Sequence, residues 1–240
     1  MSGERLPDWF AGPVAARYDE DLGSYGDPPN IAATVDFLEP LAAGGALELG
    51  IGTGRIALPL AARGVRVHGI DLSPDMVAQL RKKPGGAEIA VVLGDFSTAR
   101  VDGTFSLVYL VFNTISNLTS QDAQVACFAN AAAHLEPGGC FVVEVGVPSG
   151  QRLEVFALGD EHVGVDEYDP ATQRSASHHF TLVDGRWERL SMPFRSTYPA
   201  ELDLMARLAG MRLRERCSGW RREPFTDESR RHVSVWEKPA

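Results

Sequence analysis

The sequence predicts an α/β protein: a parallel sheet covered on both faces by helices, with an antiparallel β extension mounted on it. Short apolar runs alternate with helical patterns up to the run at 141–145. After Pro148 alternating polar and apolar stretches take over, and Asp184-Gly185 stands between two of them. Strands alternating with helices are typical of a parallel sheet, and Asp-Gly between alternating stretches is typical of a β-hairpin.

Composition indicates a globular protein with small or neutral partners. The chain has 240 residues, 44% hydrophobic and 23% charged, which suits one domain or a domain with a modest insertion. Its net charge of −9 argues against partners such as nucleic acid or an anionic membrane. The three cysteines lie far apart without a CxxC spacing, so we predict no metal site and no disulfide framework. With no apolar signal core at the N-terminus, we expect a cytoplasmic protein.

The first 30 residues are polar and turn-rich, and we predict that they form a lid segment. Asn30 follows Asp27-Pro28-Pro29 and is the predicted cap of a helix at 31–38. A core unit at 31–150 follows. Its predicted strands are 46–49, 65–71, 88–93, 105–111 and 141–145. Its later predicted helices are 55–63, one opened by Ser73-Pro74-Asp75, and 121–135, which ends before Pro137-Gly138-Gly139.

The predicted β extension spans 151–198 and contains three alternating stretches, at 161–168, 175–183 and 186–192. The remaining segment, 199–240, begins with an amphipathic helix at 199–210. Two further strands, at 211–217 and 231–237, are predicted to close the core sheet.

A glycine-rich loop and two acidic residues follow successive strands of the predicted core. Gly50-Ile51-Gly52-Thr53-Gly54 joins a strand to a helix, where glycines allow a sharp turn close to a ligand. Asp71 ends the next strand, where an acid can bind the ribose hydroxyls, and Asp95 ends the third, where it can accept a hydrogen bond from an adenine amino group. A tight turn or a helix cap explains any one of these features alone. Together, at the carboxyl ends of strands, they indicate a nucleoside site.

Arg55 distinguishes this loop from the dinucleotide-binding motif. The pattern G-x-G-x-x-G would need a third glycine at position 55, and arginine stands there. The loop therefore argues against NAD or FAD as the ligand.

Four motifs resemble those of the class I S-adenosylmethionine-dependent methyltransferases, over roughly residues 14–148. They are Glu48-Leu49-Gly50-Ile51-Gly52-Thr53-Gly54, Gly69-Ile70-Asp71-Leu72-Ser73-Pro74-Asp75-Met76, Gly94-Asp95-Phe96 and Leu135-Glu136-Pro137-Gly138-Gly139. The resemblance implies S-adenosylmethionine as the cofactor. It also implies a Rossmann-like, doubly wound, seven-stranded and mostly parallel sheet whose last strand is antiparallel.

The resemblance further implies roles for residues in these motifs. Glu48 and the glycine loop would hold the methionine part of the cofactor, Asp71 would bind the ribose, and Met76 would pack on the adenine. Tyr18 resembles an N-terminal aromatic residue that lies over the cofactor, and either Tyr18 or Phe112 could offer an aromatic face to the sulfonium. The complete set of predicted cofactor-binding residues is Tyr18, Glu48, Gly50, Gly52, Gly54, Asp71, Leu72, Met76, Gly94, Asp95, Phe96 and Phe112.

Methyl transfer is a displacement at carbon, in which positioning and desolvation supply most of the acceleration, so a base is not obligatory. Glu144, near the end of the fifth strand, is a candidate to accept a proton or pair with an amine; capping of nearby backbone is the alternative. His178 and His179 lie in the extension on opposite strand faces, so at most one points inward as a general base.

Motifs of nucleic-acid-modifying subfamilies are missing: Val111-Phe112-Asn113-Thr114 stands where DNA amino-methylating enzymes have Asn-Pro-Pro-aromatic. The extension is similar to that of bacterial small-molecule methyltransferases, including amino-sugar N-methyltransferases and natural-product tailoring enzymes. Such extensions cover the acceptor site or join two subunits, so we expect a monomer or a homodimer.

The leading hypothesis is transfer of a methyl group from S-adenosylmethionine to N or O of a small molecule, including a modified peptide. A non-catalytic protein that binds the cofactor is the first alternative. An NAD-dependent reductase is the second, disfavoured by Arg55 and Asp95.

Overall fold

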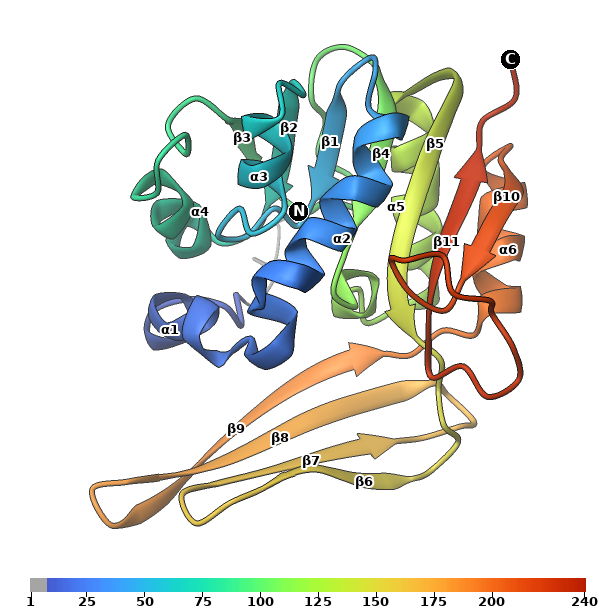
Figure 1. Ribbon diagram of the computed structural model, residues 1–240. Coiled ribbons are helices and arrows are strands. Elements are labelled where there is room, and N and C mark those ends of the chain that lie inside the picture. Colours follow the sequence, from blue (N-terminus) through green and yellow to red (C-terminus); the bar gives the residue numbers. More distant parts are fainter. Residues whose placement is uncertain (1–7) are drawn as a thin grey trace, which may run out of the picture.

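The computed structural model describes residues 8–240, and the first seven residues of the predicted lid lie outside this range (Figure 1). Two sheets form: a seven-stranded core sheet and a four-stranded extension. The order of strands in the core sheet is β10-β11-β5-β4-β1-β2-β3. The strands are β1 (Ala46–Leu49), β2 (Val67–Asp71), β3 (Ala90–Leu93), β4 (Phe105–Leu110), β5 (Leu135–Gly146), β10 (Arg212–Cys217) and β11 (Arg231–Glu237).

The core sheet confirms the predicted fold class. Strands β1 to β5 pair in parallel, and β11, the last strand of the chain, runs antiparallel between β5 and β10. Since parallel strands point their carboxyl ends to one edge, the loops after β1, β2, β4 and β5 meet there. That edge faces the extension in Figure 1.

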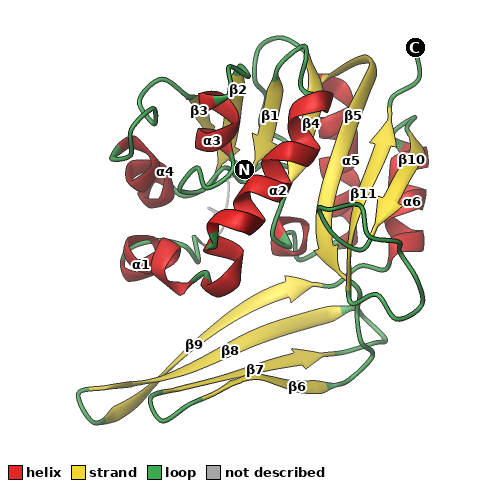
Figure 2. Cartoon of the chain, viewed as in Figure 1, coloured by secondary structure: helices red, strands yellow, loops and turns green. Residues whose placement is uncertain are grey.

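Helices pack on both faces of the core sheet (Figure 2). They are α2 (Pro28–Leu38), α3 (Ala57–Ala62), α4 (Pro74–Arg81), α5 (Gln121–His134) and α6 (Pro199–Leu208). One apolar cluster unites α5, α6 and the sheet around Phe128, Phe141 and Trp236. A second cluster lies on the opposite face, where Phe37 of α2 and Leu60 of α3 meet Tyr109 of β4.

Two features at the N-terminus differ from the predictions. Helix α2 begins at Pro28 with Asp27 as its N-cap, so Asn30 lies in the first turn and its predicted capping role is wrong. Proline suits the first helical position because its fixed φ is helical. It lacks an N–H, but an N–H at this position would have no acceptor within the helix. The predicted lid also contains a helix that its polar composition did not indicate, α1 (Pro13–Asp21).

The extension is an antiparallel sheet in the order β6-β7-β8-β9. Its strands are β6 (Leu153–Leu158), β7 (His162–Tyr168), β8 (Arg174–Val183) and β9 (Arg186–Arg195). Asp184 and Gly185 have φ values of 48° and 75°, as a tight hairpin turn requires. Strand β6 was not predicted, because at 153–158 apolar residues occur on both faces of the strand.

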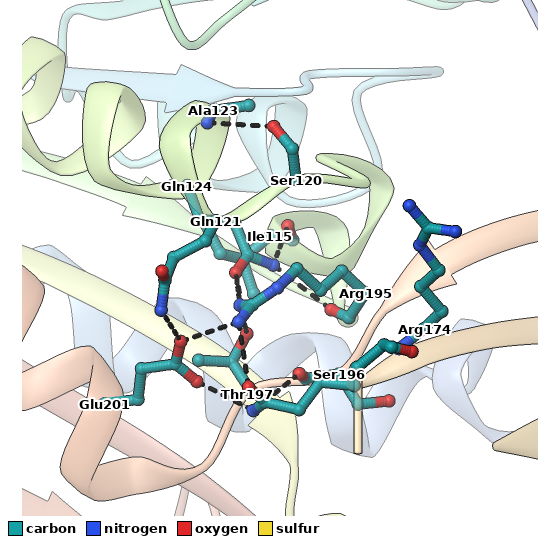
Figure 3. A network of polar contacts seen from close by, with 12 residues as sticks. Ile115, Ser120, Gln121, Ala123, Gln124, Arg174, Arg195, Ser196, Thr197 and Glu201 are labelled. Carbon is teal, nitrogen blue, oxygen red and sulfur yellow. Dashed lines mark hydrogen bonds and ion pairs between the residues drawn. The ribbon is translucent and has the colours of Figure 1, made fainter. Parts of the chain in front are cut away.

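A buried polar network joins the extension to the core (Figure 3). Arg195, at the end of β9, forms an ion pair of 2.7 Å with Glu201 of α6 and donates hydrogen bonds to Gln124 of α5 and to Gln173. Thr197 donates to the same Gln124 side chain at 2.9 Å. The network fixes how the extension leaves the core sheet. Within residues 8–240, no helix is both long and apolar enough to cross a membrane.

Candidate functional site

The glycine loop after β1 adopts backbone conformations that favour glycine. Gly50, Gly52 and Gly54 have φ values of +74°, +54° and +78°. A Cβ on Gly50 would lie 2.6 Å from Cγ2 of Thr114, and one on Gly52 would lie 3.2 Å from Cε of Met76. The loop therefore depends on these glycines for both its turn and its close packing.

Replacing Gly54 with alanine is expected to lower the free energy of unfolding by about 2–4 kcal/mol, because left-handed strain is joined by overpacking against Leu80 and Leu58. Gly64→Ala is the matched control, since Gly64 has φ +89° and no atom within 4 Å of its Cβ position. We expect the control to cost about 1 kcal/mol. Urea unfolding of both variants measures the difference, and equal losses would show that packing at Gly54 is unimportant.

Asp71, at the end of β2, shapes the glycine loop. Its Oδ2 accepts a hydrogen bond of 2.6 Å from the Gly52 N–H, and its Oδ1 accepts one of 2.9 Å from the Ser73 N–H. Burial raises the pKa of this carboxyl, while the two backbone bonds oppose the rise. The side chain therefore stands at the carboxyl edge between the loop and α4, the position predicted to bind a ribose.

Glu48 is a carboxyl group buried inside β1. The Tyr109 hydroxyl donates to its Oε2 at 2.9 Å, and burial raises the pKa of Glu48 to about 8. Arg55 opposes this rise through its positive charge. A buried carboxyl of this kind is stabilised as an anion when a further positive group binds beside it. The ammonium of a bound methionine moiety has the right charge, so Glu48 fits its predicted role.

Binding of S-adenosylmethionine at pH 7 is therefore expected to release up to one proton. Glu48 is mostly protonated below pH 8 in the free protein, and a cationic ligand lowers its pKa. Affinity should rise with pH between about 6 and 8. Calorimetry in two buffers of different ionisation enthalpy measures the proton count, with Glu48→Gln as the control that removes it. An identical proton count in the variant would contradict the assignment.

Helix α1 is fastened to the glycine loop. Asp19 accepts a hydrogen bond of 2.6 Å from the Thr53 hydroxyl and forms an ion pair of 2.5 Å with Lys83. Lys83 also donates to the Thr53 carbonyl at 2.9 Å. Tyr18, one residue away, has its pKa raised to about 12 by burial, and Arg55 and Asp71 are among the charges that act on it. Tyr18 thus lies beside the predicted cofactor loop.

The remaining predicted cofactor residues follow β2 and β3. Asp95 accepts a hydrogen bond of 2.8 Å from the Ser97 N–H, and the Gly94 N–H donates to the Asp71 carbonyl at 2.8 Å. Phe96 and Met76 are buried, and each lies close to the glycine loop, Phe96 beside Gly50 and Met76 beside Gly52. Leu72 is half-buried. Their roles toward an adenine stay predictions.

The turn after β4 is strained and holds an aromatic ring under a cation. Phe112 and Asn113 have φ values of 56° and 60°, which non-glycine residues rarely adopt, and such strain is concentrated at functional sites. The Phe112 N–H donates to Oε2 of Glu144 at 2.9 Å. The Arg55 guanidinium lies 5.5 Å from the centre of the Phe112 ring. Arg55 therefore already supplies a cation over this ring, and the contact of Phe112 with a sulfonium stays a prediction.

Glu144 lines two depressions at this edge. One is lined by α2, by Arg55 directly after the glycine loop and by the segment between β10 and β11. The other, of about 290 Å³, lies over the ends of β4 and β5. Glu144 is 5% exposed, so its carboxylate reaches them from a largely buried position. The hydrogen bond from the Phe112 N–H supports the alternative that Glu144 caps nearby backbone. The position of the Glu144 carboxylate at both depressions supports contact with an acceptor.

The two histidines of the extension make separate contacts. His178 bonds to Ser191 at 2.8 Å, and His179 contacts His162 at 3.1 Å on the other face of β8. Burial lowers the pKa of His179. Neither residue is among those lining the two depressions. A catalytic role for either stays a prediction.

Site residues that the sequence did not indicate lie directly after the glycine loop and in the C-terminal segment. Arg55 was considered only as a departure from a dinucleotide motif, yet it lies over Phe112 and lines the first depression. Arg230 and Arg231 line the depressions from the C-terminal segment. No local motif marks them, because the pairing of β11 with β5 brings them to the edge.

Comparison with known proteins agrees with the geometry of the site. Residues 46–139 match the family described as a methyltransferase domain. The chain is 31% identical to the cypemycin N-terminal methyltransferase of a Streptomyces species, over 87% of this chain and 89% of that protein. It is also 31% identical to the dTDP-3-amino-3,4,6-trideoxy-alpha-D-glucopyranose N,N-dimethyltransferase of Streptomyces venezuelae, over 55% of this chain and 53% of that one.

Among solved structures, the CcbJ methyltransferase of Streptomyces caelestis is 39% identical, with a TM-score of 0.86 over 98% of this chain and 100% of that one. The amino pentose methyltransferase CalS10, solved with bound S-adenosylmethionine, shares the fold at a TM-score of 0.67 and 22% identity. Motifs, fold and near full-length similarity agree: the chain belongs to the S-adenosylmethionine-dependent methyltransferases.

Proposed function

We propose that this enzyme methylates the nitrogen of an amine, carried by a small molecule or by a peptide. The observation that carries the proposal is the position of Glu144, a largely buried carboxylate that bonds to the Phe112 backbone and lines both depressions. A carboxylate there suits a cationic or proton-bearing acceptor better than a neutral hydroxyl. The relatives named for a peptide N-terminus and for an amino sugar support the same chemistry.

Different residues of this chain would bind the cofactor, bind the acceptor and exclude water. When bound, S-adenosylmethionine supplies an electrophilic methyl group on a positively charged sulfur. Glu48, Asp71 and the glycine loop would hold the cofactor at the ends of β1 and β2. Glu144 would align the amine and take up the proton that the nitrogen loses, while Phe112 would present its ring to the sulfonium. Helix α1, held by Asp19, would limit the access of water.

Methyl transfer from cofactor labelled with ¹³C in its methyl group tests the proposal. The acceptors are short peptides with free N-termini, amino sugars, and the matching acetylated amines and hydroxyl compounds. We expect label on nitrogen, detected by ¹³C NMR, and equimolar S-adenosylhomocysteine. Label on oxygen alone would contradict amine specificity. Cofactor binding without transfer to any acceptor would favour the alternative of a non-catalytic binding protein.

Glu144→Gln tests the role of the carboxylate. We expect kcat to fall by about 10–100-fold, the usual range for a general base or for a charged hydrogen-bond partner. Affinity for S-adenosylhomocysteine should stay within about twofold, since that ligand lacks the acceptor amine. Glu188→Gln, an exposed change of the same kind on β9, is the control. An unchanged kcat in Glu144→Gln would contradict the catalytic role of this carboxylate and leave backbone capping as its function.

A further inference from the structure

The two depressions are lined by more basic than acidic residues, although the protein as a whole is acidic. The chain carries a net charge of −9, yet the residues lining the depressions include four arginines and two glutamates. The arginines are Arg55, Arg221, Arg230 and Arg231, and the glutamates are Glu144 and Glu223. A local excess of positive charge in a concave site focuses the field toward an anionic ligand.

The start of β11 fixes two of these arginines beside Glu144. Arg231 pairs with Gly146 and Val233 pairs with Glu144 in the antiparallel ladder. Residues two apart on a strand share a face, so Arg231 and Glu144 belong to the same face of the sheet. The Arg230 carbonyl accepts a hydrogen bond of 2.8 Å from the Val147 N–H, which holds the start of β11 against the end of β5. The positive and negative groups are therefore placed by the core sheet itself.

Arg55 places a third cation at the boundary between the cofactor loop and the depressions. It directly follows the glycine loop, its guanidinium lies over the Phe112 ring, and its charge acts on Glu48. Arg55 and Arg231 line the first depression together, and Arg231 also lines the second. A ligand in these depressions thus meets a carboxylate, Glu144, with guanidinium groups close by.

We propose that the depressions at the ends of β4 and β5 recognise an acceptor that carries an anionic group, a carboxylate or a phosphate, near its amine. Glu144 binds the amine, and Arg230 and Arg231 bind the anion. Guanidinium groups suit this task because their forked donors match the oxygens of carboxylates and phosphates. The inference rests on the proposed function and names its substrate class: zwitterionic amines, as in amino acids, short peptides and phosphorylated amines.

Titration of the protein saturated with S-adenosylhomocysteine tests the anion site without needing turnover. The probes are inorganic phosphate, followed by ³¹P line broadening, and N-acetylglycine, followed by proton saturation transfer, both at constant ionic strength. Arg230→Gln and Arg231→Gln remove the proposed ligands. Arg212→Gln, an exposed change of the same charge on β10, is the control. We expect at least one probe to bind, with a dissociation constant raised at least tenfold in both test variants and unchanged in the control.

Three results would overturn the proposal. In the first, neither probe binds at 10 mM, a concentration on the order of the dissociation constant expected for a single anionic fragment. In the second, the probes bind equally well to the original protein and to the test variants. In the third, the probes bind only to the cofactor-free protein and compete with S-adenosylhomocysteine. The last outcome assigns the arginines to the carboxylate of the cofactor. Failure of the protein to bind S-adenosylhomocysteine at all would count against the proposed function instead, so the two failures are distinguishable.

Discussion

Asp71→Ala is expected to weaken the binding of S-adenosylmethionine by at least about 100-fold. The carboxylate holds the Gly52 and Ser73 N–H groups, and it is the predicted ribose ligand. A hydrogen bond to a charged group contributes about 1.5–3 kcal/mol, and two such bonds to a ribose would exceed the stated loss. Calorimetric titration with S-adenosylmethionine measures the change.

Two further variants isolate the cause of this loss. Asp71→Asn keeps the size of the side chain and removes its charge, so we expect a smaller loss than with alanine. Asp75→Ala, on the first turn of α4, removes a carboxylate that accepts from the Gly12 N–H at 2.7 Å. That carboxylate is outside the predicted ribose site, and its loss should change the affinity by no more than a few-fold. A comparable loss in Asp75→Ala would mean that α4 is disturbed generally.

Arg195→Ala is expected to cost about 3–5 kcal/mol of stability, the usual effect of breaking a buried ion pair. Arg195 is 5% exposed, and its removal leaves Glu201 without its ion-pair partner and Gln124 with Thr197 as the remaining donor to its side-chain oxygen. Burial raises the pKa of Glu201, but hydrogen bonds from Gln173, Arg195 and Gln121 outweigh it and lower the pKa overall. The bonded carboxylate therefore stabilises the fold above the unfolded pKa of Glu201, and this stabilisation is lost as the pH falls.

Thermal unfolding at pH 7 measures the loss, at about 2–4 °C for each kcal/mol in a chain of this size. Arg174→Ala, an exposed arginine of β8 in the same region (Figure 3), is the matched control and should cost less than about 1 kcal/mol. The double variant Arg195→Met with Glu201→Gln should recover part of the loss, because no unpaired charge remains. Equal losses at Arg174 and Arg195 would contradict the structural role of the network.

The features that could be predicted from the sequence are those fixed by interactions between residues close together in the chain. Alternating apolar runs, Asp184-Gly185 and the glycine loop act locally, so the core strands, the β8–β9 hairpin and the sharp turn after β1 were confirmed. The cap at Asn30 was wrong because Pro28 starts the helix two residues earlier. Helix α1 was missed, since its contacts with Thr53 and Lys83 lie far away in the sequence.

The same distinction applies to the site. Glu48 and Asp71 stand in motifs, and the structure places both at the carboxyl ends of neighbouring strands. The arginines beside Glu144 carry no motif, and they reach the edge only because β11 inserts antiparallel between β5 and β10. The proposed acceptor recognition therefore depends on a long-range strand pairing. The strand at 231–237 was predicted, but no local feature indicated that arginines at its start would lie beside Glu144.

The most direct test of the central claim is a calorimetric titration of the purified protein with S-adenosylmethionine, S-adenosylhomocysteine and NADH. The carboxyl edge of β1, β2 and β4, with Asp71 and the glycine loop, predicts micromolar, one-to-one binding of both sulfur nucleosides and none of NADH. Binding should disappear in Asp71→Ala. Binding of NADH alone, or of the sulfur nucleosides with full affinity in Asp71→Ala, would contradict the account.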